Sequence, residues 1–136
     1  MFKIFIVEDD RLEQEKIKQI LKKKDIDFKI VGNYNDAEKE MSADFFGENF
    51  GNNNQYNCVI TDLNFPRFEG ANPLPFGFCF YGRVKEIAIP CLICTNQNRH
   101  DDNGWSDMMA SVMGIKINKD IFFNKEWEKA VDMLIN

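Results

Sequence analysis

Short apolar segments alternate with longer amphipathic segments along the whole chain, and this alternation limits the fold more than any other feature. The apolar runs predict strands at residues 2–7, 28–32, 58–61, 89–95 and 114–118. The segments after them predict helices at residues 11–24, 36–46, 75–87, 105–113 and 124–136. Such alternation is typical of a parallel sheet with helices on both faces. We therefore expect a doubly wound α/β fold with five parallel strands. Among the doubly wound orders, we take the flavodoxin-like order 2-1-3-4-5 as the prediction.

The weakest of the predicted helices is the one at 75–87, because Gly77 and Gly82 lie inside it and glycine disfavours helix interiors. The Gly- and Asn-rich segment 47–57 is predicted to be a loop.

Length and charge narrow the class of protein. A chain of 136 residues is predicted to be a single domain, spanning 1–136 with no output domain. A net charge of −5 argues against a nucleic-acid-binding surface and favours a basic partner or a divalent cation. No apolar stretch approaches the roughly 18–20 residues that a membrane span needs. The N-terminus also lacks the pattern of a signal peptide, so the expected location is the cytoplasm.

Two of the four cysteines, Cys91 and Cys94, have CxxC spacing. They lie inside a predicted strand, where residues three apart face opposite sides. A redox or metal-binding CxxC motif is therefore disfavoured, and buried hydrophobic side chains are expected.

Acidic residues follow two strands that are neighbours in the predicted sheet. Glu8 and Asp9 follow the first strand, and Asp62 follows the third. Ligands of such sheets bind beyond the carboxyl ends of the strands, at the switch point. Three carboxylates that meet there repel one another unless a cation lies between them, and their hard oxygen atoms suit Mg²⁺.

A hydroxyl and an ammonium are predicted at the same edge. Thr95 ends the fourth strand, and Lys119 follows the fifth, with Lys116 as the alternative. Together with a cation, they suit a carboxylate that attacks a phosphoryl group and holds the product. Each residue also has a simpler role as a helix cap, turn residue, strand end or surface lysine. Their joint occurrence at one sheet edge favours a site.

Four segments in this order resemble the receiver domains of the response-regulator family of two-component signalling, the CheY-like domains. They are IFIVEDD, VITDLNFPRFEG, IPCLICTN and a lysine after strand five. The D-x-x-x-P-x-x-x-G pattern from Asp62 through Pro66 to Gly70 is the most specific of them.

The resemblance implies a function and roles for individual residues. Asp62 would accept phosphoryl from a histidine kinase or phosphotransfer protein, and Thr95 and Lys119 would contact that group. Mg²⁺ would be held by the residues Glu8, Asp9, Asp62 and the backbone carbonyl of Asn64. The domain would catalyse its own phosphorylation and dephosphorylation, without turnover of a small substrate. It would signal to a downstream protein by a conformational switch, as a monomer or weak dimer, without nucleic acid or membrane.

Three departures from the family pattern favour an alternative, a receiver-like interaction module that no longer switches by phosphorylation. Asn96 follows Thr95 where a small residue is usual, and Asp120 follows Lys119 where proline is usual. No aromatic residue is evident shortly before Lys119. A phosphatase of the haloacid dehalogenase kind is disfavoured, because Asn64 stands where its second Asp would be.

Overall fold

The protein forms one five-stranded parallel sheet in the order β2-β1-β3-β4-β5, as predicted. The computed structural model describes residues 2–42, 55–95, 108, 111–116, 119–122 and 124–136. Its strands are β1 (Lys3–Val7), β2 (Asp27–Val31), β3 (Cys58–Thr61), β4 (Cys91–Cys94) and β5 (Ile121–Phe122). Its helices are α1 (Arg11–Lys23), α2 (Tyr34–Ser42), α3 (Phe76–Glu86) and α5 (Trp127–Ile135).

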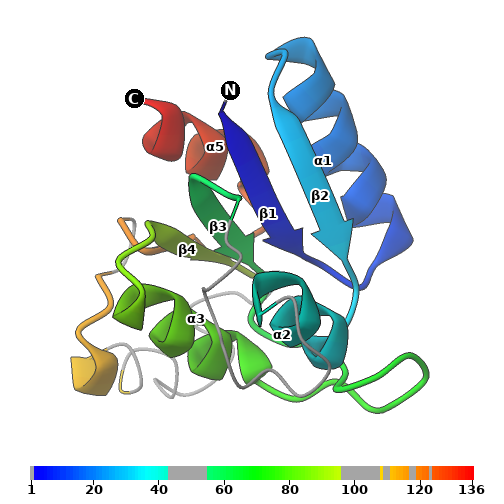
Figure 1. The fold of residues 1–136 in the computed structure, drawn as a ribbon, viewed down its shortest axis with the longest axis vertical. Helices are drawn as coiled ribbons and strands as arrows, with labels where there is room; N and C mark the ends of the chain where they lie inside the picture. Colours follow the sequence, from blue (N-terminus) through cyan, green and yellow to red (C-terminus); the bar gives the residue numbers. More distant parts are fainter. Residues whose placement is uncertain (1, 43–54, 96–107, 109–110, 117–118, 123) are drawn as a thin grey trace.

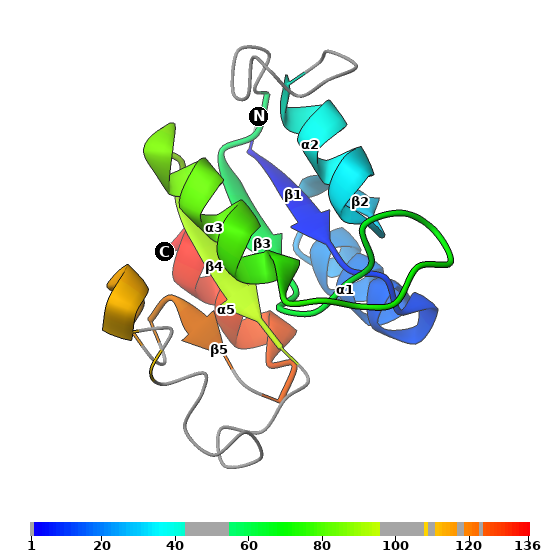
Figure 2. The ribbon, with the colours of Figure 1, turned by 90° about the horizontal axis from the view of Figure 1, so that it is seen from below.

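Helices cover both faces of the sheet (Figures 1 and 2), with α1 and α5 on one face and α2 and α3 on the other. The apolar run of β1 explains this arrangement. Ile4 and Ile6 pack toward α1 and α5, whereas Phe5 and Val7 pack in the opposite layer. Successive side chains of a strand point to opposite faces, so a continuous apolar run fits a strand that is covered on both sides.

Most of the predicted elements are confirmed, with shifts of a few residues at their ends. The strand predicted at 58–61 matches β3, and the weak helix predicted at 75–87 forms as α3. Asp10 caps α1, because its side chain accepts hydrogen bonds from the first backbone N–H groups of the helix. Residue 108 and residues 111–113 are helical. The rest of that predicted helix, residues 43–46 of the second one and most of the predicted loop at 47–57 lie outside the described residues.

The prediction of a fifth strand at 114–118 is wrong. β5 is Ile121–Phe122, which pairs with β4 in parallel through Ile93↔Ile121 and Cys94↔Phe122. Among the described residues of the predicted range, Ile115 is buried in the core as a single apolar anchor and adopts no strand conformation. The alternation of apolar and polar residues at 114–118 thus favoured the wrong segment, because tertiary pairing with β4 selects the strand.

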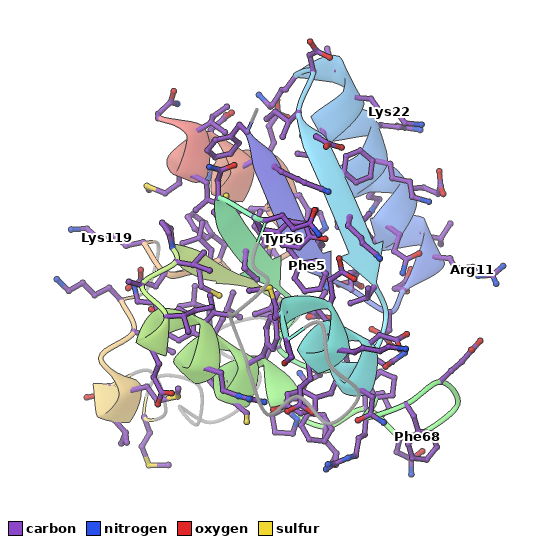
Figure 3. The ribbon with its side chains drawn as sticks, viewed as in Figure 1. Phe5, Arg11, Lys22, Tyr56, Phe68 and Lys119 are labelled. Carbon is purple, nitrogen blue, oxygen red and sulfur yellow. The ribbon has the colours of Figure 1, made fainter. Side chains whose placement is uncertain are left out.

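The connection from β3 to α3 is long and folds back on itself. Phe65 and Leu74 form an isolated antiparallel bridge, and Phe68 projects from the far end of the connection (Figure 3). The carbonyl groups of Pro66 and Arg67 accept hydrogen bonds from the first two backbone N–H groups of α2. These bonds attach the connection to α2 and satisfy donors that a helix N-terminus leaves open.

Among the described helices, none combines the length and the apolar character that crossing a bilayer requires.

The cysteines are expected to differ sharply in reactivity. Cys58, Cys91 and Cys94 are buried, whereas Cys79 is exposed. Burial raises the pKa of Cys58 to about 12 and raises the pKa of Cys91 and Cys94 above the usual range. The thiolate is the reactive form, so a disulfide reagent at pH 8 should modify one thiol quickly and the other three only after unfolding. Cys79→Ser should abolish the fast reaction. Two fast thiols in the native protein would contradict this assignment.

Candidate functional site

Three carboxylates meet at the carboxyl edge of the sheet. Glu8 and Asp9 follow β1, Asp62 follows β3, and the two strands are paired with Val7 opposite Thr61. One carboxylate oxygen from each of the three lies within 4.8 Å of the others. No other group of three or more potential metal-ligating Cys, His, Asp or Glu side chains occurs in the part of the chain that the structure describes. The predicted acidic cluster is therefore present.

The cluster lines a pocket of about 300 Å³. Asn64 and Thr95, both predicted site residues, line the same pocket, and so does Pro73 from the long β3–α3 connection. Thr95 is almost completely buried just beyond β4, and its backbone N–H donates to the carbonyl of Phe122 in β5. Asn96 lies outside the described residues.

The cationic member of the site is Lys125, which the sequence analysis missed. Its Nζ lies 2.5 Å from Glu8 Oε2 and 3.0 Å from Asp62 Oδ2. All three side chains are buried, with exposed fractions of 7% for Lys125, 1% for Glu8 and 9% for Asp62. The ammonium group therefore bridges the carboxylates of two neighbouring strands, away from bulk water.

The assignment of Lys119 or Lys116 to the site is wrong. Both side chains are exposed, and Figure 3 shows Lys119 pointing away from the sheet. The physical reason is the position of β5. Both lysines precede this strand, whereas Lys125 follows it at the carboxyl edge. The short apolar run at 121–123 followed by a lysine was the sequence signal that marked the correct strand.

With Lys125 as the site lysine, two departures from the family pattern have to be assessed again, the missing aromatic residue before the lysine and the identity of the residue after it. The aromatic residue Phe122 lies three residues before Lys125 and is buried at 5% exposure. Asp120 precedes β5, where its carboxylate accepts a hydrogen bond from the backbone N–H of Lys116. Glu126, and not a proline, follows the site lysine.

The backbone around Lys125 is unusual. Asn124 and Lys125 have φ angles of +61° and +51°. This is a left-handed backbone conformation that residues other than glycine seldom adopt. The backbone N–H of Lys125 donates to the carbonyl of Thr95 at 2.8 Å. This bond to the end of β4 holds the turn in place, so that the lysine side chain reaches across the sheet edge to Asp62.

Trp127 supports the lysine from the side. Lys125 Nζ lies 5.0 Å from the centroid of the Trp127 ring, within cation–π distance. The indole N–H donates to Glu13 Oε2 of α1 at 2.8 Å. The contact between α1 and α5 is therefore coupled to the position of the site lysine.

Hydrogen bonds also fix the carboxylates. The backbone N–H of Leu63 donates to Asp62 Oδ1 at 2.7 Å, while Oδ2 faces Lys125. The backbone N–H of Asp10 donates to Glu8 Oε1 at 3.2 Å. Each of these bonds comes from a residue close in sequence to the carboxylate, so the orientation of the site is determined locally once the strands have paired.

Burial and charge crowding shift the pKa values of the acidic groups upward. Burial, followed by the charge of Asp62, raises the pKa of Glu8 to about 8 although Lys125 opposes the shift. Burial likewise raises the pKa of Asp62 against the opposing effect of Lys125. For Asp9, loss of hydration and then the charge of Asp62 raise the pKa.

The pKa of the Lys125 ammonium is raised as well, but for a different reason. Burial lowers the pKa of Lys125, but the charges of Asp62 and Glu8 outweigh it and the pKa is raised.

The donor set fits a hard divalent cation. Three carboxylates face one ammonium group, so full ionisation leaves an excess of two negative charges, which matches the charge of one such ion. Oxygen-only ligands with room for water are what Mg²⁺ prefers. Glu8, Asp9 and Asp62 are the side chains that would hold it, and Asn64 lines the same pocket.

Comparison with solved structures identifies the known fold that this chain adopts. No protein-family model matches the sequence, and no curated protein matches it significantly. Solved structures do match over nearly the whole chain. A response regulator receiver domain protein from Clostridium thermocellum superposes with a TM-score of 0.68 at 16% identity, over 100% of this chain and 93% of that one.

Two further solved structures match this chain with similar TM-scores. A CheY-like receiver domain protein from Methanospirillum hungatei JF-1 has a TM-score of 0.66 at 15% identity, covering 99% of this chain and 94% of its own. A two-component response regulator from Clostridium difficile has a TM-score of 0.65 at 17% identity, covering 100% and 98%. The chain therefore has the fold of the CheY-like response regulator receiver domains, as its sequence motifs suggested.

Proposed function

We propose that the protein is a phosphoryl-accepting receiver domain in which Asp62 is the acceptor. The observation that carries the proposal is the position of Asp62, whose Oδ2 lies 3.0 Å from a buried lysine while its carboxylate belongs to a three-carboxylate cluster. The donor would be the phosphohistidine of a histidine kinase or phosphotransfer protein. The output would be a protein contact made by a cytoplasmic monomer or weak dimer.

The geometry gives Asp62 the properties of a nucleophile. Leu63 holds Oδ1, which leaves Oδ2 as the attacking oxygen. That oxygen forms a bond to phosphorus as the P–N bond to the donor imidazole breaks, and the imidazole leaves with the bonding electron pair. Mg²⁺ held by the carboxylate cluster would neutralise charge on the transferred oxygens.

We assign Lys125 and Thr95 to the binding of the phosphoryl group once it is attached to Asp62. In the unmodified protein Lys125 pairs with Asp62 and Glu8. Once Asp62 carries phosphoryl, the ammonium is positioned to pair with the new anionic oxygens, because preorganised cations stabilise such charge in a water-excluded site. The hydroxyl of Thr95, which lines the same pocket, is the second donor assigned to the phosphoryl group.

One observation favours a second candidate, a receiver-like interaction module that does not switch. Lys125 neutralises part of the buried negative charge of Glu8 and Asp62. Such a pair stabilises the fold whether or not phosphoryl transfer occurs. The phosphorylation experiment below discriminates between the two candidates.

Incubation with phosphoramidate or acetyl phosphate and Mg²⁺ should add one phosphoryl group, observed as an intact-mass shift. Omission of Mg²⁺ should suppress the addition, because the transferred oxygens then lack charge neutralisation. The modified protein should also lose the mass shift on incubation at alkaline pH, as expected for an acyl phosphate.

Asp62→Asn is the matched control, since it keeps the shape of the side chain and removes the nucleophile. No added mass on the native protein, or equal addition to Asp62→Asn, contradicts the proposed role and leaves the interaction module as the better account.

Mg²⁺ should change the fluorescence of Trp127. A cation bound by Glu8 and Asp62 competes with Lys125 for their oxygens, and the ammonium lies against the indole ring. Trp105→Phe leaves Trp127 as the single tryptophan of the chain. A saturable change on Mg²⁺ titration, reversed by EDTA, is expected in this variant. Adding Asp9→Asn should weaken the apparent affinity by at least about tenfold, the loss typical of a disturbed metal site. An identical titration with Asp9→Asn refutes the metal assignment.

Lys125→Gln should slow phosphorylation by about 100-fold, the usual effect of losing one preorganised donor. Without Mg²⁺ it should also lower the free energy of unfolding by about 3 kcal/mol, because two buried carboxylates lose their partner. Lys119→Gln is the control and should change stability by no more than about 0.5 kcal/mol, as expected for a surface substitution. The rate is measured by mass spectrometry and the stability by urea unfolding. Equal effects of the two substitutions would contradict the assignment of Lys125 and make Lys119 a candidate for the site lysine again.

A further inference from the structure

Helix α3 approaches the backbone of Asp62 at a distance that leaves no space for a side chain. The contact is made by Gly77, in the first turn of the helix, and Figure 2 shows α3 lying across β3. A Cβ atom at this position would lie 2.3 Å from the carbonyl oxygen of Asp62 and 2.6 Å from Leu63 Cα. Both contacts are with backbone atoms, which rotamer changes cannot relieve. Any residue larger than glycine therefore has to displace either α3 or the peptide between Asp62 and Leu63.

That peptide is the one that orients the acceptor. Its C=O belongs to Asp62, and its N–H, on Leu63, donates to Asp62 Oδ1 at 2.7 Å. A peptide group is planar and rigid, so a push on the carbonyl also turns the N–H away from the carboxylate. The position of the main chain against Gly77 is thereby linked to the direction of the side chain.

One further hydrogen bond holds this peptide, and another holds the peptide that follows it, between Leu63 and Asn64. The Thr61 hydroxyl donates to the carbonyl oxygen of Asp62 at 2.9 Å. The backbone N–H of Gly77 donates to the carbonyl of Leu63 at 2.9 Å. The Asp62–Leu63 peptide is thus held by Thr61 of β3, and the next peptide is held by the start of α3. The missing side chain of Gly77 lets α3 come this close to both.

We propose that Gly77 is a positioning residue for the acceptor, because its missing side chain lets α3 pack against the Asp62–Leu63 peptide without turning it from the orientation that aims Oδ2 at Lys125. The inference rests on the proposed function for its catalytic consequence. Its geometric part concerns the folded protein alone. Gly77 contacts neither phosphoryl donor nor cation and acts through Asp62.

Gly77→Ala and Gly82→Ala form a matched pair of variants. Both replace a glycine inside α3, so both gain the same helix propensity. At Gly82 a Cβ would meet, among the residues that the structure describes, only the end of the Met113 side chain, at an ordinary 3.7 Å. Val84→Ala serves as a second control, because it loosens the packing of the same helix at a fully buried position without pushing on Asp62.

Two quantities are measured in each folded variant. The first is the environment of the Leu63 backbone amide, which is observed as its ¹H–¹⁵N chemical shift and its hydrogen-exchange protection. The second is the rate of phosphorylation by phosphoramidate at saturating Mg²⁺, corrected for the folded fraction from urea unfolding. A role confined to stability changes the folded fraction and leaves the corrected rate unaltered.

For Gly77→Ala we expect a shifted Leu63 amide with reduced protection and a corrected rate lower by about 10- to 100-fold, the scale that misplacing a reacting group produces. Gly82→Ala and Val84→Ala should keep the native Leu63 amide and a rate within about twofold of the unsubstituted protein, because neither displaces the acceptor. A native amide together with a native rate in Gly77→Ala overturns the inference. A reduced stability with an unchanged corrected rate also overturns it.

A second variant keeps the test decisive if Gly77→Ala does not fold. Thr61→Val removes the hydroxyl that holds the same carbonyl at nearly constant volume. It should shift the Leu63 amide and slow phosphorylation in the same direction, and native values would refute the linkage between peptide and carboxylate. If the unsubstituted protein takes up no phosphoryl group, the proposed function fails, and the Leu63 amide alone decides whether Gly77 positions Asp62.

Discussion

The pairing of Lys125 with Glu8 and Asp62 is the interaction on which the rest of the site depends. Parallel strands at a switch point bring their carboxyl ends together, and here that geometry forces acidic side chains into a buried cluster. Leaving buried charges unpaired is far more costly than pairing them. The lysine therefore stabilises the sheet edge, and the turn that supplies it adopts left-handed φ angles at two successive residues without glycine.

Much of this arrangement could be predicted from the sequence because it follows from local patterns. The continuous apolar run of β1 requires burial on both faces, and the acidic residues directly after it can lie only at the carboxyl edge. The same argument places Asp62 after β3. Since β1 and β3 pair with Val7 opposite Thr61, the acidic cluster follows from strand order alone.

The lysine could not be predicted in this way because β5 is only two residues long. A strand this short carries no periodicity, and its position depends on pairing with β4. Residues 114–118 alternate more clearly between apolar and polar side chains, so the fifth strand was assigned to them. Because that strand was placed too early in the chain, Lys119 was assigned to the site instead of Lys125, and the aromatic residue before Lys125 was not identified. Gly77 was likewise visible in the sequence only as a weakness of α3, because its contact with the Asp62 backbone exists only in three dimensions.

The same pairing that stabilises the site also sets the conditions for a switch. Glu8 and Asp62 offer their oxygens to Lys125 and are also the side chains that would hold a cation, so the two compete. Lys125 also lies over the Trp127 ring, and the Trp127 indole is bonded to Glu13 on α1. On the other side, the missing side chain of Gly77 lets α3 pack directly against the Asp62–Leu63 peptide. Under the proposed function, a change of charge at Asp62 would act on helices of both layers through contacts that are already formed.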